Sequence, residues 1–388
     1  MAARRAGGAA PAGRPDRRLR TAAAGGAPGP RRPPRLRRAA RPATTAGRRG
    51  GRRAAGLAAM NIAIFGWYHH RNAGDDRMAQ CLVRWLEGHT LAFLPAGRPP
   101  PLDLLRSCDA ALIGGGGLIM DRGGVFRDVA RWMRRAGIPV ALAGVSAERL
   151  DEPLRRELRA ALGRAVFAWF RDRASLAAVG EHPRAFVAPD LTWLYPLPEA
   201  PAAGAGLAVA LSRRPGFDAA SWRRALAALD APLHPLPLYF ENGGDAALIA
   251  ELLGPQAVPE ELDLAPLRHA AAVLTSRYHG LIFALQSGRP ALVTGEQPKL
   301  RRFLAEHELE DWAVAGPQEL ASRWRRMERD LAAHAARARR LRRRLHDEVW
   351  RRTEEPRERL LAAAAALPPP GRRPLNRLRR LLDFGDRF

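Results

Sequence analysis

Residues 60–66 are Met-Asn-Ile-Ala-Ile-Phe-Gly, and residues 67–76 continue as Trp-Tyr-His-His-Arg-Asn-Ala-Gly-Asp-Asp. A short apolar run that ends at a glycine and is followed by a polar segment is typical of a strand that leads into a loop. Residues 75–87 follow with Met78, Leu82, Trp85 and Leu86 at helical spacing on one face. This strand, loop and helix predict the first unit of an α/β fold.

The segment before Met60 consists almost wholly of Ala, Gly, Pro and Arg and contains no aromatic residue. Such a composition offers no apolar surface to offset the conformational entropy lost on folding. We therefore expect residues 1–59 to be disordered and Met60 to be the biological start, which makes the segment translated upstream sequence or a dispensable tail. A targeting peptide is the alternative, but the segment lacks the apolar region of a secretory signal and the Ser-rich composition of a transit peptide.

The formal net charge of +25 is carried by the two ends of the chain. Residues 1–59 hold 16 arginines and one acid, and residues 321–388 hold 20 arginines and nine acids, whereas residues 60–320 are close to neutral. A neutral middle without a basic stripe argues against nucleic acid as a partner.

The two cysteines, Cys81 and Cys108, fit neither a disulfide framework nor a zinc or redox spacing, which favours a reducing compartment. The sequence has no run of the roughly 18 apolar residues that a membrane span requires. We therefore predict a cytoplasmic protein.

Short apolar runs alternate with longer amphipathic ones from Met60 onward, which is the pattern of βα units around a parallel sheet. The first series predicts strands over 62–65, 91–94, 110–113, 140–145, 166–170 and 185–188. A Pro-rich linker at 196–201 precedes a second series, with strands over 207–211, 233–238, 271–275 and 291–293 and helices over 219–229, 245–253 and 281–286. We predict an α/β fold of two Rossmann-like domains, residues 60–198 and 199–316, that face a central cleft.

Residues 317–388 are predicted to form a basic helical extension and a tail. Leu331, Leu341, Leu345 and Val349 recur among arginines, which favours a solvated helix that packs one apolar stripe on the body. The second interpretation is peripheral contact with anionic lipids on the inner face of the membrane, where each clustered arginine contributes about 1 kcal/mol. The last residues, from Pro368 on, are expected to fray.

Four candidate sites follow predicted strands, where open α/β sheets bind their ligands. The first is the loop that contains Asn72, Gly74, Asp75 and Asp76. Asp75 is either the N-cap of the following helix or a carboxylate that faces the substrate, and Asp76 shares the second possibility. Both interpretations stay open at this point.

The second site is the glycine run 114–117, which is followed by Asp121. Glycines such as Gly115 and Gly116 let backbone N–H groups approach an anion or a sugar closely. The run is neither a Walker A loop nor a clean dinucleotide-binding fingerprint.

The third site begins with Arg171 and Asp172, directly after the strand predicted over 166–170. Asp172 is well placed as a helix N-cap, with Ser175 three residues on. Arg171, at the carboxyl end of a strand, is expected to point into the cleft, where its planar fork suits a carboxylate or a phosphate.

The fourth site contains Ser276, Arg277 and His279, between a predicted strand and a predicted helix. If the chain is still extended there, the side chains of Arg277 and His279 point to the same side. The following helix directs its N-terminus at the same place, so these two side chains and the backbone amides together favour anion binding and catalysis.

Taken together, these motifs resemble the polysaccharide pyruvyltransferases. That family carries an Asn-x-Gly-Asp-Glu-like loop, a Gly-Gly-Gly segment with a following Asp, an Arg-Asp-x-x-Ser element, and a Ser-Arg-x-His block followed by Gly-x-Pro and a Lys. The matching positions here are 72–76, 114–121, 171–175, 276–279, 288–290 and Lys299. Order and spacing agree from Met60 to about Glu306. Asp76 stands where the family usually has Glu, and the first loop is unusually bulky.

The resemblance implies a GT-B-like fold and transfer of pyruvate from phosphoenolpyruvate to a sugar of a cell-surface polysaccharide or its lipid-linked precursor, usually as a ketal. It implies His279 as the general acid, because the enol ether becomes electrophilic at C2 once C3 is protonated. Arg277 and Arg171 bind the anionic groups of the donor, and Asp75 or Asp121 accepts the hydroxyl proton. The other residues expected to contact substrates are Asn72, Gly74, Asp76, Gly115, Gly116, Ser276 and Lys299. The scheme requires no metal and no cofactor besides the donor substrate.

Two alternatives stay open on the sequence alone. One is a GT-B-type glycosyltransferase that uses a nucleotide sugar, because one fold supports many activities. The other is a non-catalytic binding protein of the same fold, against which the presence of Arg277 and His279 argues.

A chain that begins at Met60 should keep the melting temperature and the activity of the full chain, because residues 1–59 have no apolar content to pack. Thermal unfolding of both chains, followed by circular dichroism, measures the difference. A drop of more than a few degrees in the shorter chain would show that the segment is structural.

Overall fold

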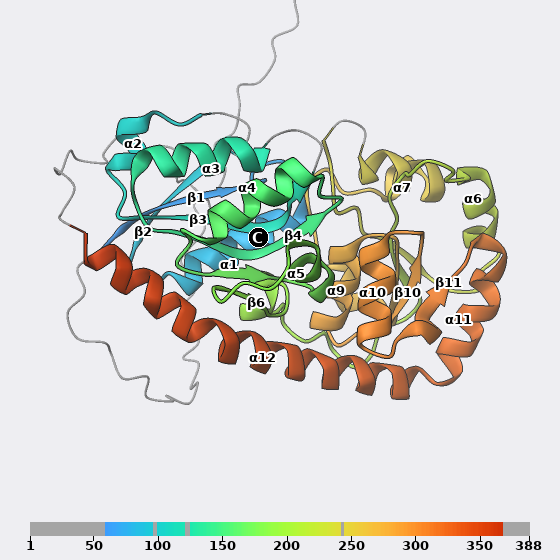
Figure 1. The fold of residues 1–388 in the computed structure, drawn as a ribbon. Helices are drawn as coiled ribbons and strands as arrows, with labels where there is room; N and C mark the ends of the chain where they lie inside the picture. The colour runs from blue at the N-terminus through green and yellow to red at the C-terminus, as the bar shows by residue number, and fades with distance from the viewer. Residues whose placement is uncertain (1–58, 96–98, 121–124, 242–243, 368–388) are drawn as a thin grey trace, which may run out of the picture. The chain divides into compact units, whose positions relative to one another are not determined.

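The computed structural model describes residues 59–95, 99–120, 125–241 and 244–367. The expectations for residues 1–58, for Asp121 and for the tail 368–388 lie outside the described residues. The described chain forms two parallel sheets with their helices and a long C-terminal helix (Figure 1). This confirms the predicted α/β fold class, with two Rossmann-like sheets, as in a GT-B-like fold, and a C-terminal helical extension.

The first sheet has six parallel strands in the order β2-β1-β3-β4-β5-β6. Its strands are β1 (Asn61–Gly66), β2 (Thr90–Pro95), β3 (Ala110–Met120), β4 (Val140–Glu148), β5 (Ala168–Phe170) and β6 (Ala185–Val187). Its helices are α1 (Ala73–Trp85), α2 (Leu102–Arg106), α3 (Val125–Ala136), α4 (Glu152–Leu162), α5 (Arg173–Val179) and the 3-10 helix η1 (Leu191–Leu194). The strand order reverses between β1 and β3, and such a reversal is where open α/β sheets bind ligands.

The second sheet has five parallel strands in the order β11-β10-β9-β7-β8. Its strands are β7 (Leu207–Ala210), β8 (Leu233–Pro235), β9 (Ala272–Thr275), β10 (Ala291–Thr294) and β11 (Ala313–Val314). Its helices are α6 (Ala219–Ala227), α7 (Asp245–Leu253), α8 (Pro266–His269), α9 (Tyr278–Gln286) and α10 (Pro298–Glu306), with 3-10 helices η2 (Pro255–Ala257), η3 (Glu310–Trp312) and η4 (Pro317–Glu319). Here the order reverses between β7 and β9, so the residues after these strands form the corresponding ligand site.

Strand β1 shows why the opening sequence forms a buried strand. Ile62 and Ile64 point to one face and pack in a core that continues into the second sheet, whereas Ala63 and Phe65 pack in a separate core on the other face. All four side chains are completely buried. A strand buried on both faces has to be apolar throughout, as residues 62–65 are.

The C-terminal extension consists of α11 (Leu320–Arg329) and α12 (Leu331–Ala365). Leu341, Leu345 and Val349 of α12 are buried, which confirms the predicted apolar stripe. The helix contacts elements of both sheets: Trp350 Nε1 donates to the carbonyl of Leu194 in η1 at 3.0 Å, and α12 also packs against α9 (Figure 1). No helix in the described part of the chain has the length and apolar character needed to cross a membrane.

Candidate active site

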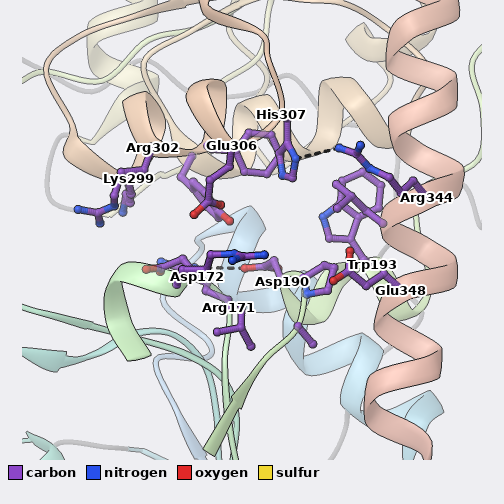
Figure 2. A pocket seen from close by; sticks show the side chains of 17 residues that line it. Arg171, Asp172, Asp190, Trp193, Lys299, Arg302, Glu306, His307, Arg344 and Glu348 are labelled. Carbon is purple, nitrogen blue, oxygen red and sulfur yellow. Dashed lines mark hydrogen bonds and ion pairs between the residues drawn. The ribbon is translucent and has the colours of Figure 1, made fainter. Parts of the chain in front are cut away.

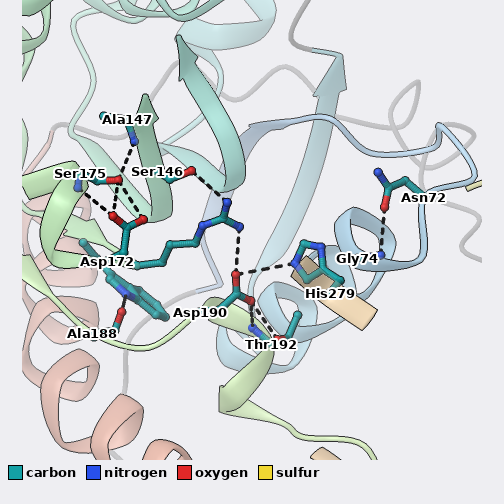
Figure 3. A network of polar contacts seen from close by, with 12 residues as sticks. Asn72, Gly74, Ser146, Ala147, Asp172, Ser175, Ala188, Asp190, Thr192 and His279 are labelled. Atoms are coloured by element: carbon teal, nitrogen blue, oxygen red, sulfur yellow. Dashed lines mark hydrogen bonds and ion pairs between the residues drawn. The ribbon is translucent and has the colours of Figure 1, made fainter. Parts of the chain in front are cut away.

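The loop after β1 enters α1 through Asn72. The backbone of Asn72 is extended, and its side-chain oxygen accepts a hydrogen bond from the N–H of Gly74 at 3.1 Å (Figure 3). Asn72 is therefore the N-cap of α1, and the interpretation of Asp75 as the N-cap is wrong. Asp75 lies in the first turn of the helix, which leaves its carboxylate available for another role.

Gly74 brings α1 into direct contact with His279, which lies in the first turn of α9. A Cβ atom at Gly74 would lie 1.9 Å from Nδ1 of His279, so any other residue would displace the imidazole. The missing side chain thus lets the ring pack on the first turn of α1, within electrostatic reach of Asp75. The structure joins two of the four predicted sites at this contact.

Asp190 lies on the other side of the His279 ring. Its Oδ2 is 3.7 Å from Nε2 of His279, and its Oδ1 accepts hydrogen bonds from the N–H and the hydroxyl of Thr192 at 3.0 and 2.9 Å (Figure 3). Burial alone would raise the pKa of Asp190, but His279, Arg171 and Thr192 together hold that pKa well below its usual value. The ionised carboxylate favours the His279 tautomer with a proton on Nε2, and Nδ1 is the nitrogen that faces α1.

Arg171 follows β5, but protein groups already occupy its planar fork. Nη1 donates to Oδ2 of Asp190 at 3.2 Å and Nη2 donates to Oγ of Ser146 at 2.9 Å. The guanidinium carbon lies 4.6 Å from the centre of the Tyr278 ring, and the side chain is 3% exposed. The expected carboxylate partner of Arg171 is therefore, in this structure, the protein's own Asp190.

Arg277 is the residue that precedes α9, and the chain turns into the helix directly after it. The condition of an extended chain through His279 is therefore not met, and the two side chains have different partners. Nε of Arg277 donates to Oδ1 of Asp245 at 3.0 Å, Nη2 also donates to that oxygen, and the guanidinium lies 5.5 Å from the centre of the Tyr239 ring. Asp245, the first residue of α7, is 1% exposed, and its burial raises its pKa against the attraction of Arg277.

Four cations lie in segments that follow strands of the two sheets. Lys299 is within electrostatic reach of the other three, Arg171, Arg214 and Arg277. Burial and the positive charges of Arg171, Arg214 and Arg277 lower the pKa of Lys299 to about 8. Burial and Arg277 also lower the pKa of Arg214. Among the described residues, neither Lys299 nor Arg214 forms an ion pair. Because these cations repel one another, an anion bound between them would be stabilised.

The glycine run lies within β3, which continues to Met120, and is not a free loop, which corrects the prediction. Gly115 and Gly116 have φ angles of 58° and 83°, in the left-handed region that favours glycine. A Cβ atom at Gly115 would lie 2.5 Å from the sulfur of Met78, and one at Gly116 would lie 3.0 Å from Oδ1 of Asp75. These glycines therefore let the backbone of β3 lie against the first turns of α1.

Asp75 is partly buried between these groups. Burial raises the pKa of Asp75 to about 6, although the positive charges of His279 and Arg171 oppose this shift. Asp76, the next residue, accepts a hydrogen bond from the N–H of His69 at 3.2 Å. Asp75 thus lies within electrostatic reach of His279, as Asp190 does.

Two other residues of the predicted motifs have structural partners. The hydroxyl oxygen of Ser276 accepts a hydrogen bond from the N–H of Ser212 at 2.9 Å and so ties the ends of β9 and β7 together. The carboxylate of Asp172 accepts one from the N–H of Ser175 at 2.8 Å, which confirms Asp172 as the N-cap of α5.

A model of the polysaccharide pyruvyl transferase family matches residues 72–298, which is more than half of the chain. The chain belongs to this family. A comparison with curated proteins finds no match.

Solved structures similar to this polysaccharide pyruvyl transferase family member have low sequence identity. The calicheamicin glycosyltransferase CalG4 is 16% identical with a TM-score of 0.48, over 78% of this chain and 99% of that one. Anabaena HepE, in complex with UDP-glucose, is 12% identical with a TM-score of 0.49, over 79% of this chain and all of that one (100%). S. aureus MnaA, in complex with UDP, is 10% identical with a TM-score of 0.46, over 72% and 90% of the two chains.

A cavity of about 560 Å³ lies beside Arg171 in this family member (Figure 2). Its walls come from the segments after β5 and β6, from α10 and from α12, and include Arg171, Asp172, Asp190, Tyr278, Lys299, Arg302, His307 and Arg344. His279, Arg277 and Asp75 do not line it. The cavity therefore adjoins the cationic group through Arg171 and Lys299. Its His307 accepts a hydrogen bond at 3.0 Å from Arg344, and burial with that arginine lowers the pKa of His307 to about 4.

Sequence reasoning missed Asp190, Arg214 and Asp245. Asp190 and Arg214 each follow a predicted strand by two or three residues, so the rule that selected Arg171 and Arg277 could have found them. Asp245 opens a predicted helix, where an acid is ordinarily explained by the helix dipole, and only its pairing with Arg277 distinguishes it. Within the described residues, no group of three or more His, Cys, Asp and Glu side chains could hold a metal ion.

Asp75→Asn should stabilise the protein above pH 6. The pKa of Asp75 is raised to about 6, so the folded state binds its proton more tightly than the unfolded state, and stability falls as pH rises through this range. The gain from the substitution should grow by about 1–2 kcal/mol between pH 4.5 and 7.5. Urea unfolding at both pH values measures it. The exposed Asp347→Asn is the control, and an equal gain for Asp75→Asn at both pH values would contradict the prediction.

Proposed function

We propose that this chain transfers the pyruvyl group of phosphoenolpyruvate to a sugar of a cell-surface polysaccharide or of its lipid-linked precursor, and that the product is a pyruvate ketal. Family membership supports a transferase that acts on polysaccharides. The observation that carries the proposal is His279, placed between the buried Asp190 and Asp75 and close to a group of cations. An acid, a base and an anion site are the parts that this reaction requires.

The cationic group supports an anionic donor. Phosphoenolpyruvate carries a phosphate and a carboxylate. Arg171 and Arg277 are already balanced by Asp190 and Asp245, whereas Lys299 and Arg214 have no such partner in the described part of the chain. A donor phosphate beside Lys299 would relieve the repulsion that lowers the pKa of this lysine. The same charges would stabilise the phosphate as it leaves.

The reaction needs one proton delivered to carbon and two removed from oxygen. Protonation of C3 converts the methylene of the donor into a methyl group and makes C2 electrophilic. A sugar hydroxyl then adds to C2 and loses its proton, the bond from C2 to the phosphate oxygen breaks, and a second hydroxyl closes the ketal and loses its proton. One hydroxyl proton replaces the proton given to C3, and the other leaves with phosphate.

His279 and Asp75 suit the two roles. Oδ2 of Asp190 lies 3.7 Å from Nε2 of His279, so a carboxylate held ionised by its other partners lies beside the ring that we assign as the general acid. Asp75, with a pKa of about 6, is mostly ionised near neutral pH and still basic enough to accept a hydroxyl proton. Asp121 stays the second candidate for the base.

His279→Asn should still bind phosphoenolpyruvate but should release phosphate about 100-fold more slowly or worse, because it cannot donate the proton. Calorimetric titration with phosphoenolpyruvate measures binding, and phosphate release with a panel of lipid-linked and nucleotide-linked sugars measures turnover. The exposed His269→Asn is the matched control and should behave as the unchanged protein. Near-normal turnover in His279→Asn would exclude this residue as the acid.

Arg277→Lys should weaken phosphoenolpyruvate binding by about tenfold, because lysine keeps the charge but loses the planar fork. Calorimetry measures the dissociation constant, with the melting temperature as a check on folding. Arg213→Lys, at an exposed ion pair with Glu251, is the control and should bind normally. Unchanged affinity in Arg277→Lys would show that the anion binds at other residues.

Thermal stabilisation by UDP and not by phosphoenolpyruvate would favour a nucleotide-sugar donor.

A further inference from the structure

Trp67 differs from the other tryptophans of the chain in its exposure. All nine tryptophans lie in the described part of the chain. Trp67 is the most exposed of them, with 41% of its surface accessible to solvent. It follows β1 directly and opens the loop that leads to Asn72 and Asp75. A large apolar side chain left exposed beside a candidate active site points to a ligand that covers it.

The loop after Trp67 is held in a strained conformation. His69 and Arg71 have φ angles of 66° and 47°, and they are two of the four non-glycine residues with positive φ among the described residues. Such a conformation costs on the order of 1–3 kcal/mol for each residue and persists only where surrounding contacts enforce it. Here the contacts come from the second sheet: Arg71 Nη2 donates to the carbonyl of Glu260 at 2.8 Å, and Phe240 N–H donates to the carbonyl of Arg71 at 3.2 Å.

The conformation of this loop places the Trp67 ring against His70. The ring of Trp67 stacks on that of His70, with centroids 4.0 Å apart and planes inclined by 15°. Nδ1 of His70 lies 3.2 Å from Oε2 of Glu241, which belongs to the second sheet's side of the site. One face of the indole is therefore covered, and its orientation is fixed by a residue that is itself anchored.

Two carboxylates lie beside this stack, those of Asp76 and Glu241. Asp76 accepts a hydrogen bond from His69 and lies within electrostatic reach of both His70 and Glu241. An anionic ligand would be repelled by Asp76 and Glu241, whereas the hydroxyl groups of a neutral sugar donate readily to such oxygens. The anionic donor of the proposed reaction would instead bind beside the cations Arg214, Arg277 and Lys299.

We propose that Trp67 is the stacking platform of an acceptor subsite that binds one pyranose ring, with Asp76 and Glu241 as acceptors for its hydroxyl groups. The proposal rests on the proposed function, since it names the acceptor side of the same reaction. A pyranose presents a face of C–H groups that packs on an aromatic ring and an edge of hydroxyls that hydrogen-bond. The subsite lies in the same loop and helix start as Asp75, the candidate base.

Saturation-transfer NMR tests the subsite without turnover. The probes are methyl β-galactoside, methyl β-glucoside and methyl α-mannoside, added to the full chain without phosphoenolpyruvate. At least one should receive saturation from the unchanged protein and from Val83→Ala, whose substituted residue is equally exposed at 43% but lies on the outer surface of α1. The signal should fall at least about fivefold in Trp67→Ala and be largely restored in Trp67→Phe, since the stacking contribution is on the order of 1 kcal/mol. No signal from any glycoside, or an equal signal in Trp67→Ala, would overturn the proposal.

Two further measurements separate this proposal from the proposed function. Trp67→Leu keeps an apolar side chain without an aromatic face, so it controls for folding and should lose the signal as Trp67→Ala does. Calorimetric titration with phosphoenolpyruvate should give the same dissociation constant in the unchanged protein and in Trp67→Ala. Sugar binding at Trp67 without any phosphoenolpyruvate binding would overturn the proposed donor and leave the subsite standing, whereas a weaker donor affinity in Trp67→Ala would show that this residue is not specific to the acceptor.

Discussion

The ionised carboxylate of Asp190, buried between Arg171, Thr192 and His279, sets the geometry of the candidate site. A buried charge is stable only where its neighbours replace the lost hydration, and removing one partner of such a pair typically costs about 3–5 kcal/mol. Two of these neighbours come from the first sheet and one from α9 of the second. The charge of Asp190 is therefore compensated by groups from both sheets, which favours their packing against each other. The contact between Asp190 and His279 also positions the imidazole. Gly74 permits this approach, because any side chain there would occupy the place of His279.

Charge is divided between two sides of the site. Arg214, Arg277 and Lys299 follow strands of the second sheet, whereas Asp75 and Asp76 lie in the first turn of α1, where the helix dipole favours acids. Asp245 pairs with Arg277, whereas Lys299 forms no ion pair among the described residues, and the charge of Glu148 only partly offsets the repulsion that lowers the pKa of this lysine. In the proposed reaction, the anionic donor would bind on the side of the second sheet and the neutral acceptor on the side of α1.

The sequence predicted ten of the eleven described strands, all except β11, because each of the ten depends on a local apolar run, as residues 62–65 show. It also indicated that Asn72, Arg171 and Arg277 follow parallel strands, where open α/β sheets bind ligands. What it could not predict depends on long-range contacts. Asn72 rather than Asp75 caps α1, and Asn72 forms a bridge with Tyr239, far along the chain. Arg171 pairs with Asp190, and Arg277 pairs with Asp245. The sequence contains many other acids, and these pairs follow only from the tertiary packing.

The arginine-rich C-terminal helix uses part of its charge in contacts with the rest of the fold. Arg342 Nε donates to the carbonyl of Gln286 at 2.6 Å and its Nη2 donates to the carbonyl of Leu197 at 3.0 Å, so one arginine of α12 ties the end of α9 to the segment between the sheets. Arg337 pairs with Asp311 at 2.9 Å in the same way. The donors of Arg342 thereby satisfy two backbone carbonyl groups, while Arg337 holds α12 against η3. Because α9 carries His279 at its other end, α12 helps to fix the position of the ring that Asp190 orients, and the basic extension is part of the framework of the site.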